Sequence, residues 1–189
     1  MSTLVEQEKS KYDRMWDYPG YKFWNGPSRV TKFMDKCFTG KHSVLEFGCG
    51  TGMNSLTMHN QGHDVWMMDI TDHSLLPEAK DALGHRFFVS PIHLIPDAIP
   101  HCEFGFCGDV MEHVPTVWVS SSFAAIKKKV DCCYFLICGV GDTYGKYINE
   151  TLHLTVQSKD WWIEEMLKHW KTVEDCGSEK STYALIGRK

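Results

Sequence analysis

The sequence predicts a three-layer α/β sandwich built around a mostly parallel sheet. Two observations lead to this prediction: short β-rich runs alternate with helical stretches along most of the chain, and several of those runs are continuously hydrophobic. Strands buried on both faces have this composition, and strands that alternate with helices form parallel sheets. With 189 residues, 43% of them hydrophobic, the chain can build a sizeable core, and we expect residues 1–189 to form a single domain.

Seven runs predict the strands of this sheet. The first five alternate with helical stretches, and the last two flank the turn-like segment GSEK, which predicts a hairpin. The strand runs are SVLEF (43–47), DVWMMD (64–69), RFFVS (86–90), EFGFCG (103–108), DCCYFLICG (131–139), KTVEDC (171–176) and STYALIGR (181–188). Helical patterns cover residues 53–60, 73–83, 116–129 and 159–170.

Composition narrows the classes of partner. The net charge is −4 and the pI is about 6.2, so no basic excess predicts a nucleic-acid partner or an acidic membrane surface. The longest apolar run, CCYFLICGVG, is shorter than the roughly 20 residues that span a bilayer. The 8 cysteines lack paired C-x-x-C spacing, and the polar start of the chain is unlike a secretory leader. We therefore expect a reducing, cytoplasmic setting.

The stretch VLEFGCGTG, at residues 44–52, predicts a ligand-binding loop after the first strand. It is not the dinucleotide motif, because Met53 stands where the third glycine would be, and it lacks the lysine of a phosphate-binding loop. Glycines let backbone N–H groups approach a ligand, and the helix start beyond them favours a carboxylate. Asp69 ends the second strand, where an acid can accept hydrogen bonds from both hydroxyls of a ribose. S-adenosylmethionine has both an amino-acid end and an adenosine end.

The chain resembles the class I S-adenosylmethionine-dependent methyltransferases. The resemblance is carried by EFGCGTG (46–52), by MMDIT at the end of the second strand and by GDVMEHVP after the fourth, and it covers about residues 41–189. It implies a Rossmann-like, seven-stranded sheet in which the C-terminal hairpin supplies an antiparallel strand. It also implies methyl transfer from S-adenosylmethionine to an oxygen or nitrogen of an acceptor. With no appended recognition domain, no base-methylation motif and a negative net charge, we expect the acceptor to be a small molecule or a small polar polymer end.

The resemblance also implies roles for single residues. The three glycines would pack against the methionine portion, Glu46 would orient the loop and the amino group, and Asp69 would hold the ribose. Ile70 would lie along the adenine, and Asp109 would lie near the sulfonium. The family often places an acid after the third strand to meet the adenine amine, and here only Ser90 is available. The predicted cofactor-binding residues are Glu46, Gly48, Cys49, Gly50, Gly52, Asp69, Ile70, Ser90 and Asp109.

A second constellation, DVMEHVP, places Asp109, Glu112 and His113 at a strand-to-helix turn. Three interpretations remain open: structural packing, removal of the acceptor's proton, and a metal site. The segment resembles the E-x-x-E-H of small-RNA 2′-O-methyltransferases and ubiquinone-pathway enzymes, which add a histidine from a later loop. His153 has the place of that histidine, whereas Asp109 departs from the pattern. We take Glu112, His113 and His153 as candidate catalytic residues and do not assign a metal.

Three irregular regions are expected to select the acceptor. Residues 91–100 and 139–158 follow strands and should form pocket walls. Residues 1–40 are expected to form a helical lid over the core at residues 41–189, although their aromatic side chains also suit ordinary packing. Those aromatic residues are Tyr12, Trp16, Tyr18, Tyr21, Phe23 and Trp24. Two alternatives stay open: a non-catalytic module that binds this cofactor, and an enzyme that transfers or cleaves another group of it.

Overall fold

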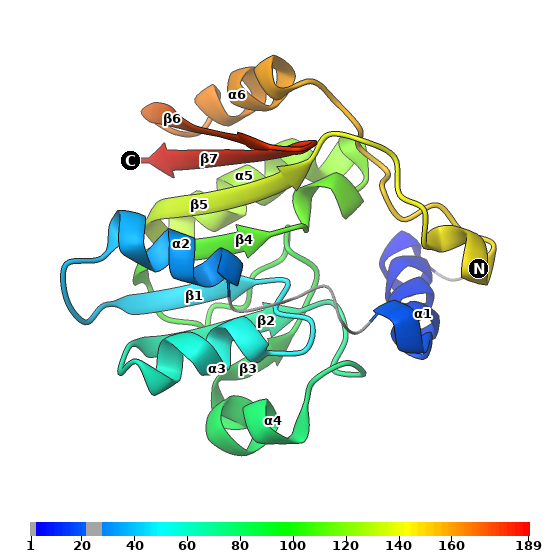
Figure 1. The fold of residues 1–189 in the computed structure, drawn as a ribbon, viewed down its shortest axis with the longest axis horizontal. Helices are drawn as coiled ribbons and strands as arrows, with labels where there is room; N and C mark the ends of the chain where they lie inside the picture. Colours follow the sequence, from blue (N-terminus) through cyan, green and yellow to red (C-terminus); the bar gives the residue numbers. More distant parts are fainter. Residues whose placement is uncertain (1–2, 22–27) are drawn as a thin grey trace.

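A seven-stranded sheet in the order β3-β2-β1-β4-β5-β7-β6 forms the centre of the computed structural model, which describes residues 3–21 and 28–189 (Figure 1). The first five strands are parallel, and β7 runs antiparallel between β5 and β6. This arrangement confirms the predicted sheet and its antiparallel C-terminal hairpin. The strands are β1 (Ser43–Phe47), β2 (Asp64–Asp69), β3 (Phe87–Val89), β4 (Cys102–Gly108), β5 (Val130–Cys138), β6 (Thr172–Glu179) and β7 (Thr182–Arg188).

The predicted helices and the predicted hairpin are present, with some of their bounds shifted. The helix expected over residues 159–170 ends at Leu167. The helix expected from residue 73 begins at Pro77, whose fixed φ suits a first helical turn. The hairpin turn falls at residues 180–181, because β6 continues through an irregularity between Asp175 and Ser178. The helices are α1 (Leu4–Trp16), α2 (Ser28–Cys37), α3 (Met53–Asn60), α4 (Pro77–Leu83), α5 (Thr116–Lys129) and α6 (Lys159–Leu167), with 3₁₀ turns η1 (Pro19–Tyr21), η2 (Gly84–Arg86), η3 (Met111–His113) and η4 (Gly145–Ile148).

Each face of the sheet carries its own hydrophobic core. On one face, α5 and α6 bury Phe123 and Trp162 against β1 and β5. On the other face, α2, α3 and α4 pack against β1, β2 and β4, with Phe33 and Met58 fully buried. Helix α2 therefore belongs to the sandwich, although it lies within the segment expected to form a lid.

Helix α1 lies apart from these layers, beyond the carboxyl ends of the parallel strands (Figure 1). On one side, Lys11 donates to the carbonyl of Thr151 and Arg14 to that of Ile148, both at 3.2 Å. On the other side, Asp13 accepts a hydrogen bond from the hydroxyl of Thr71 in the loop after β2. The helix therefore bridges two loops that follow strands, and the space between those loops lies beneath it.

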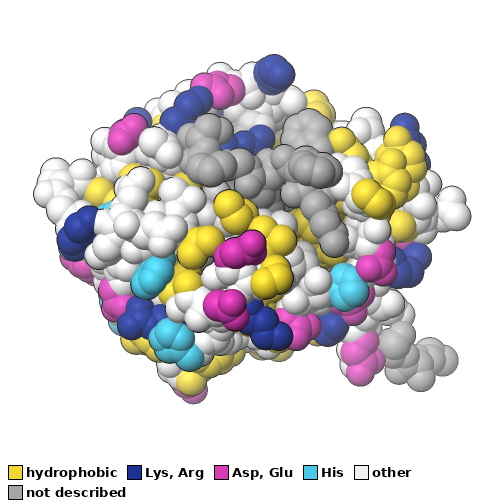
Figure 2. Space-filling model, turned by 60° about the horizontal axis from the view of Figure 1, so that its bottom comes forward, with side chains coloured by type: hydrophobic (Ala, Val, Ile, Leu, Met, Phe, Trp, Pro, Cys, Tyr) yellow, Lys and Arg dark blue, Asp and Glu magenta, His cyan; other side chains and the backbone are white. Residues whose placement is uncertain are grey.

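The surface mixes charges of both signs. On the face in Figure 2, acidic, basic and hydrophobic side chains are interspersed. Among residues 3–21 and 28–189, the structure contains no helix with the length and apolar character to cross a bilayer. The predicted aromatic residues Phe23 and Trp24 lie outside the described residues.

Candidate functional site

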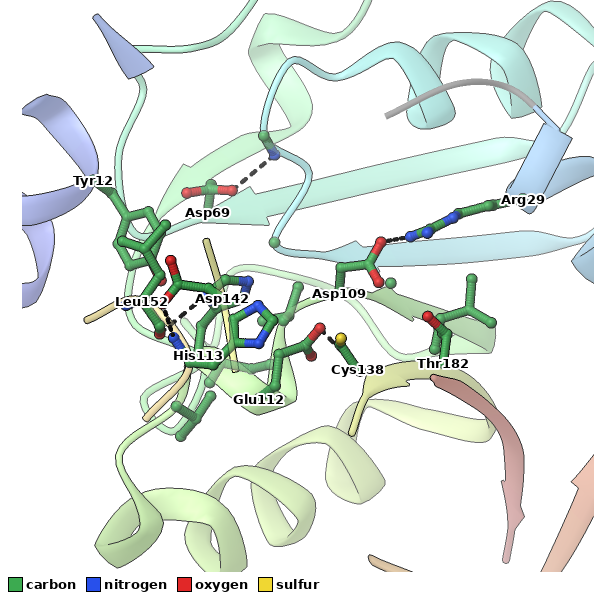
Figure 3. A pocket seen from close by; sticks show the side chains of 18 of the residues that line it. Tyr12, Arg29, Asp69, Asp109, Glu112, His113, Cys138, Asp142, Leu152 and Thr182 are labelled. Carbon is green, nitrogen blue, oxygen red and sulfur yellow. Dashed lines mark hydrogen bonds and ion pairs between the residues drawn. The ribbon is translucent and has the colours of Figure 1, made fainter. Parts of the chain in front are cut away.

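A cavity of about 970 Å³ opens at the carboxyl ends of the parallel strands (Figure 3). Its walls come from α1, the start of α2, the glycine loop, the loops after β2, β3, β4 and β5, the start of α5 and the β6–β7 hairpin. Most of the predicted site residues meet here, whereas Glu46, Cys49 and Gly52 do not line the cavity. The predicted residues that line it are Gly48, Gly50, Asp69, Ile70, Ser90, Asp109, Glu112, His113 and His153.

The glycine loop adopts a backbone that only glycine tolerates well. Gly48, Gly50 and Gly52 have φ values of +69°, +52° and +77°. A Cβ on Gly48 would lie 2.3 Å from Cγ2 of Val110, the residue before η3. The loop can therefore pack against Val110 only because Gly48 has no side chain. The N–H groups of Gly48 and Cys49 both donate to the carbonyl of Met68, which fixes the loop to the end of β2.

Glu46 lies beneath the loop. Its carboxylate accepts hydrogen bonds from Ser55 Oγ at 2.5 Å and from Asn54 Nδ2 at 3.1 Å, both in the first turns of α3. Burial raises the pKa of Glu46 to about 7, against the lowering effect of these hydrogen bonds. The residue therefore ties β1 to α3 and holds the loop from below.

Asp69 joins the glycine loop to the cavity wall. Its carboxylate accepts the N–H of Gly50 at 2.8 Å and that of Thr71 at 3.2 Å. Burial raises the pKa of Asp69 to about 6, although the backbone hydrogen bonds act in the opposite direction. Each carboxylate oxygen has more than one acceptor position, so both can still accept a hydroxyl from the cavity.

The wall after β3 contains the predicted Ser90 together with His93 and Trp118, which the sequence analysis did not single out. Ser90 donates its hydroxyl to the carbonyl of Leu94 at 2.6 Å, so its hydrogen already closes the loop. Beside it, the ring of His93 stacks on Trp118 of α5 with centroids 4.3 Å apart. Both rings line the cavity, and Nδ1 of His93 is buried and has no partner within residues 3–21 and 28–189. No local pattern connects residues 93 and 118, which only the fold brings together.

Glu112 is the most deeply buried polar residue of the cavity wall, with no exposed surface. Its Oε1 accepts the N–H of Cys138 at 3.0 Å, whereas Oε2 is buried and has no hydrogen-bond partner in the part of the chain that the structure describes. Burial raises the pKa of this carboxyl to about 7. A carboxyl with one unpaired oxygen and a pKa near neutrality can accept a proton from a bound ligand.

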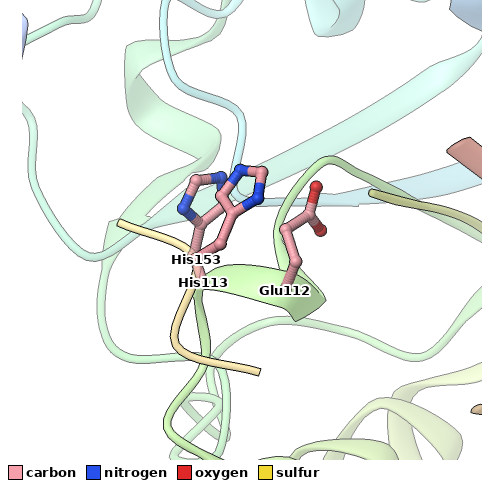
Figure 4. Close-up of side chains that lie close together, drawn as sticks. All are labelled: Glu112, His113 and His153. Carbon is pink, nitrogen blue, oxygen red and sulfur yellow. The ribbon is translucent and has the colours of Figure 1, made fainter. Parts of the chain in front are cut away.

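His113 and His153 lie next to Glu112 (Figure 4). Their rings meet edge to face with centroids 4.7 Å apart, and one ligand atom from each of the three residues lies within 4.8 Å of the others. Nδ1 of His113 contacts the carbonyl of Leu152 at 3.1 Å, and Nδ1 of His153 contacts that of Val140 at 2.5 Å. A carbonyl accepts only from a protonated nitrogen, so in the neutral rings Nε2 carries the lone pair. The pKa of His113 is lowered to about 3, mainly by burial and to a smaller extent by the neighbouring His153, so its ring stays neutral.

Asp109 is held apart from this group. It has a φ of +54° and donates its N–H to the carbonyl of Leu136 at 2.9 Å. Its carboxylate forms an ion pair with Arg29 of α2 (Figure 3). The sequence gives no sign of this partner, which is 80 residues away in the chain.

The loop after β5 is organised by Asp142. This carboxylate accepts the N–H groups of Gly145 at 2.6 Å, Leu152 at 2.9 Å and His153 at 3.4 Å. Burial would raise its pKa, but these hydrogen bonds lower it below the usual value. The loop thus folds around its own acid, and it carries His153 to the cavity.

Comparison with known proteins places this geometry in context. No protein-family model matches the chain, and no curated protein matches it. Among solved structures, the PH0226 protein from Pyrococcus horikoshii OT3 is similar with a TM-score of 0.69 and 14% identity, over 90% of this chain and 95% of that one. A 1,6-didemethyltoxoflavin-N1-methyltransferase from Burkholderia thailandensis, solved with its substrate and S-adenosylhomocysteine, gives a TM-score of 0.69 and 15% identity, over 100% and 91% of the two chains.

A third similar structure is the small RNA methyltransferase HEN1, with a TM-score of 0.67 and 14% identity. The match covers 86% of this chain but only 25% of that one. At such identities the similarity concerns the fold. The strand order, the antiparallel hairpin and these matches together show that the chain has the Rossmann-like fold of the class I S-adenosylmethionine-dependent methyltransferases.

Proposed function

We propose that this protein binds S-adenosylmethionine and transfers its methyl group to an oxygen or nitrogen of a small-molecule acceptor. The observation that carries the proposal is the hydrogen bond from the N–H of Gly50 to the carboxylate of Asp69 at the cavity wall. It presents a glycine loop and a carboxylate side by side, at the strand ends where nucleoside ligands bind in such sheets. The similar methyltransferase from B. thailandensis has S-adenosylhomocysteine bound, which supports the same ligand here.

The roles of the chain's own residues follow from their positions. The glycine loop would hold the methionine portion, Asp69 the ribose and Ile70 the adenine. The cofactor supplies a methyl group already activated by its sulfonium, so alignment and exclusion of water provide much of the rate. A hydroxyl or amine must also lose a proton. Glu112 suits this role better than His113, because its pKa is raised to about 7 whereas that of His113 is lowered to about 3.

The position of α1 supports the proposal that the N-terminal segment acts as a lid. Tyr12, Trp16 and Tyr21 line the cavity from above, and Tyr18 stacks on Tyr147 with centroids 4.3 Å apart. The aromatic side chains thus divide between the cavity wall and packing against the loop after β5. A lid of this kind would keep water away from the sulfonium.

Calorimetric titration with S-adenosylmethionine and S-adenosylhomocysteine tests cofactor binding. We expect Asp69→Ala to weaken binding by about 1–3 kcal/mol, because the ribose hydroxyls lose a buried partner. Asp64→Ala is the matched control, since Asp64 begins the same strand at its other end, and its affinity should equal that of the unmodified protein. Unchanged affinity in Asp69→Ala would remove this residue from the site.

A screen of candidate acceptors separates an enzyme from the alternatives. Formation of a methylated acceptor and S-adenosylhomocysteine supports the methyltransferase. Tight cofactor binding without turnover on any acceptor would instead favour a non-catalytic binding module. Appearance of other cofactor fragments would favour transfer or cleavage of another group.

Metal-assisted methyl transfer is a second candidate, favoured by one specific observation. Glu112 offers an oxygen that has no partner among the described residues, and both histidines hold their Nδ1 against carbonyls, which leaves the lone pair of each neutral ring on Nε2. Histidine ligands of metals commonly have this outer hydrogen bond. Glu112, His113 and His153 could hold a divalent ion, which would supply Lewis acidity at the acceptor oxygen. Titration with Mn²⁺, followed by electron paramagnetic resonance, should show a site that His153→Ala removes; no binding in the unmodified protein would reject this candidate.

A further inference from the structure

We propose that Tyr12, which α1 carries, contacts the acceptor and helps to select it, and that this part of the cavity accepts hydroxyl or amine compounds and rejects carboxylates. The inference rests on the proposed function, which it deepens by naming the class of acceptor. It depends on two features of the cavity: an unpaired phenol and the balance of charge around it.

The hydroxyl of Tyr12 is buried and has no hydrogen-bond partner among residues 3–21 and 28–189, although the residue lines the cavity. Its ring meets that of His113 edge to face, with centroids 5.7 Å apart and an interplanar angle of 83°. Figure 3 shows Tyr12 on the same side of the cavity as His113. Leaving such a group unpaired costs about 1–3 kcal/mol, so a polar group of a bound ligand is the expected partner.

The neighbourhood assigns this partner to the acceptor. Tyr12 contacts His113, which directly follows Glu112 in η3, and Glu112 is the group proposed to take up the acceptor's proton. Tyr12 therefore lies beside the part of the cavity that is proposed to handle the acceptor. Two unpaired buried oxygens, the Tyr12 hydroxyl and Oε2 of Glu112, thus serve the same region of the cavity.

The charges around this region favour some acceptors over others. Glu112, Asp69 and Asp142 all act on the neighbouring Tyr21 hydroxyl and raise its pKa, after burial as the main cause. Two nearby cations are already engaged: Lys11 contacts Glu8 at 2.5 Å, and Arg29 pairs with Asp109. In this poorly solvated space the acidic side chains would repel a carboxylate. They would not repel a neutral alcohol, and they would attract an ammonium group.

Three probes with one ring and different polar groups test the proposal: benzyl alcohol, benzylamine and benzoate. Each is titrated by NMR into protein saturated with S-adenosylhomocysteine, and also into protein without it. EDTA is present throughout, so that no divalent ion adds positive charge. We expect the alcohol and the amine to bind at least about tenfold more tightly than benzoate. The reason is that the acidic side chains repel the charge of benzoate, whereas the alcohol and the ammonium group can hydrogen-bond to this part of the cavity.

The variant Tyr12→Phe removes only the hydroxyl and keeps the ring against His113. It should weaken binding of the alcohol and the amine by roughly three- to tenfold. Its affinity for S-adenosylhomocysteine should stay within about twofold of the unmodified protein, because the proposal assigns the hydroxyl to the acceptor and not to the cofactor. Tyr183→Phe is the matched control on β7, outside the cavity lining, and should change neither affinity.

Several results would overturn the proposal. These are equal binding of benzoate, no binding of any probe at its solubility limit, unchanged probe affinity in Tyr12→Phe, and a tenfold loss of cofactor affinity in that variant. The last result would assign Tyr12 to the cofactor. Failure of the proposed function is distinct, because it appears as absent S-adenosylhomocysteine binding in the unmodified protein.

Discussion

The two halves of the cavity satisfy their polar groups in different ways. At the ends of β1 and β2, hydrogen bonds within the chain already engage the key groups: Asp69 binds the N–H of Gly50, and Glu46 binds Ser55 and Asn54. At the ends of β4 and β5 and on α1 above them, two buried cavity-lining atoms have no partner among the described residues, namely Oε2 of Glu112 and the hydroxyl of Tyr12. The unpaired buried atoms near the glycine loop, Thr51 Oγ1 and Asn54 Oδ1, belong to residues that do not line the cavity. The first half is pre-organised around a rigid loop, whereas the second half needs a ligand to complete its hydrogen bonds.

This difference predicts which half of the cavity governs cofactor binding and which half selects the acceptor. A preformed loop spends little free energy on ordering when its ligand arrives. Unpaired buried groups discriminate between ligands, because a wrong ligand leaves them unpaired. We therefore expect changes in the first half to act on cofactor affinity and stability, and changes in the second half to act on the acceptor.

The largest expected effect comes from breaking the rigid loop. Gly48→Ala forces a Cβ to 2.3 Å from Val110 at a φ of +69°. We expect it to destabilise the fold by about 3–5 kcal/mol and to abolish cofactor binding, because strain and overpacking add. Urea unfolding and calorimetry measure both effects. Gly40→Ala is the control, since its Cβ would contact nothing within 4 Å; equal stability of the two variants would contradict the rigid-loop model.

A stabilising change is expected in the second half. Burial raises the pKa of Glu112 from 4.5 to about 7. Because the folded state binds this proton more tightly, the stability from Glu112 is complete below pH 4.5 and is lost as the pH rises to 7. Glu112→Gln has no charge to bury, so it should exceed the unmodified protein in stability by about 3 kcal/mol at pH 8 and by almost nothing at pH 4. Urea unfolding at both pH values measures this, and a pH-independent difference would contradict it.

An intermediate effect is expected at the loop that carries His153. Asp142→Ala leaves three backbone N–H groups without their acceptor. We expect a loss of about 2 kcal/mol in unfolding free energy and faster hydrogen exchange at Gly145 and Leu152. The amides of the glycine loop should keep their protection. Faster exchange in both loops would show that the two halves are coupled rather than independent.

The smallest effect is expected from Ser90→Ala. The hydroxyl closes the loop after β3 by donating to Leu94, so its loss should cost about 0.5–1 kcal/mol of stability. Cofactor affinity should change by less than about threefold, because this hydrogen is not free for the ligand. Calorimetry with S-adenosylhomocysteine tests the point. A tenfold loss would instead give Ser90 a direct role at the adenine.

The first half of the cavity was largely predictable, since its signals are local. Gly48, Gly50 and Asp69 lie within a strand-loop-helix-strand unit, and period and composition gave β1, β2 and α3 their observed bounds. The second half was only partly predictable. His113 and His153 were proposed from a motif, and their proximity is now visible. His93 lies in the segment 91–100 that was expected to form a pocket wall, although the residue itself was not singled out. Arg29 and Trp118 carry no local signal, because long-range packing alone brings them to the cavity.

The contacts by which α1 bridges the two loops have a consequence for how long a ligand stays bound beneath it. Its outer contacts lie near solvent and include the ion pair of Arg14 with Glu150. Such pairs are weakened by dissolved salt. If spent cofactor leaves only when α1 swings away, its residence time on the protein will shorten as ionic strength rises, even where equilibrium contacts deep in the cavity are unaffected.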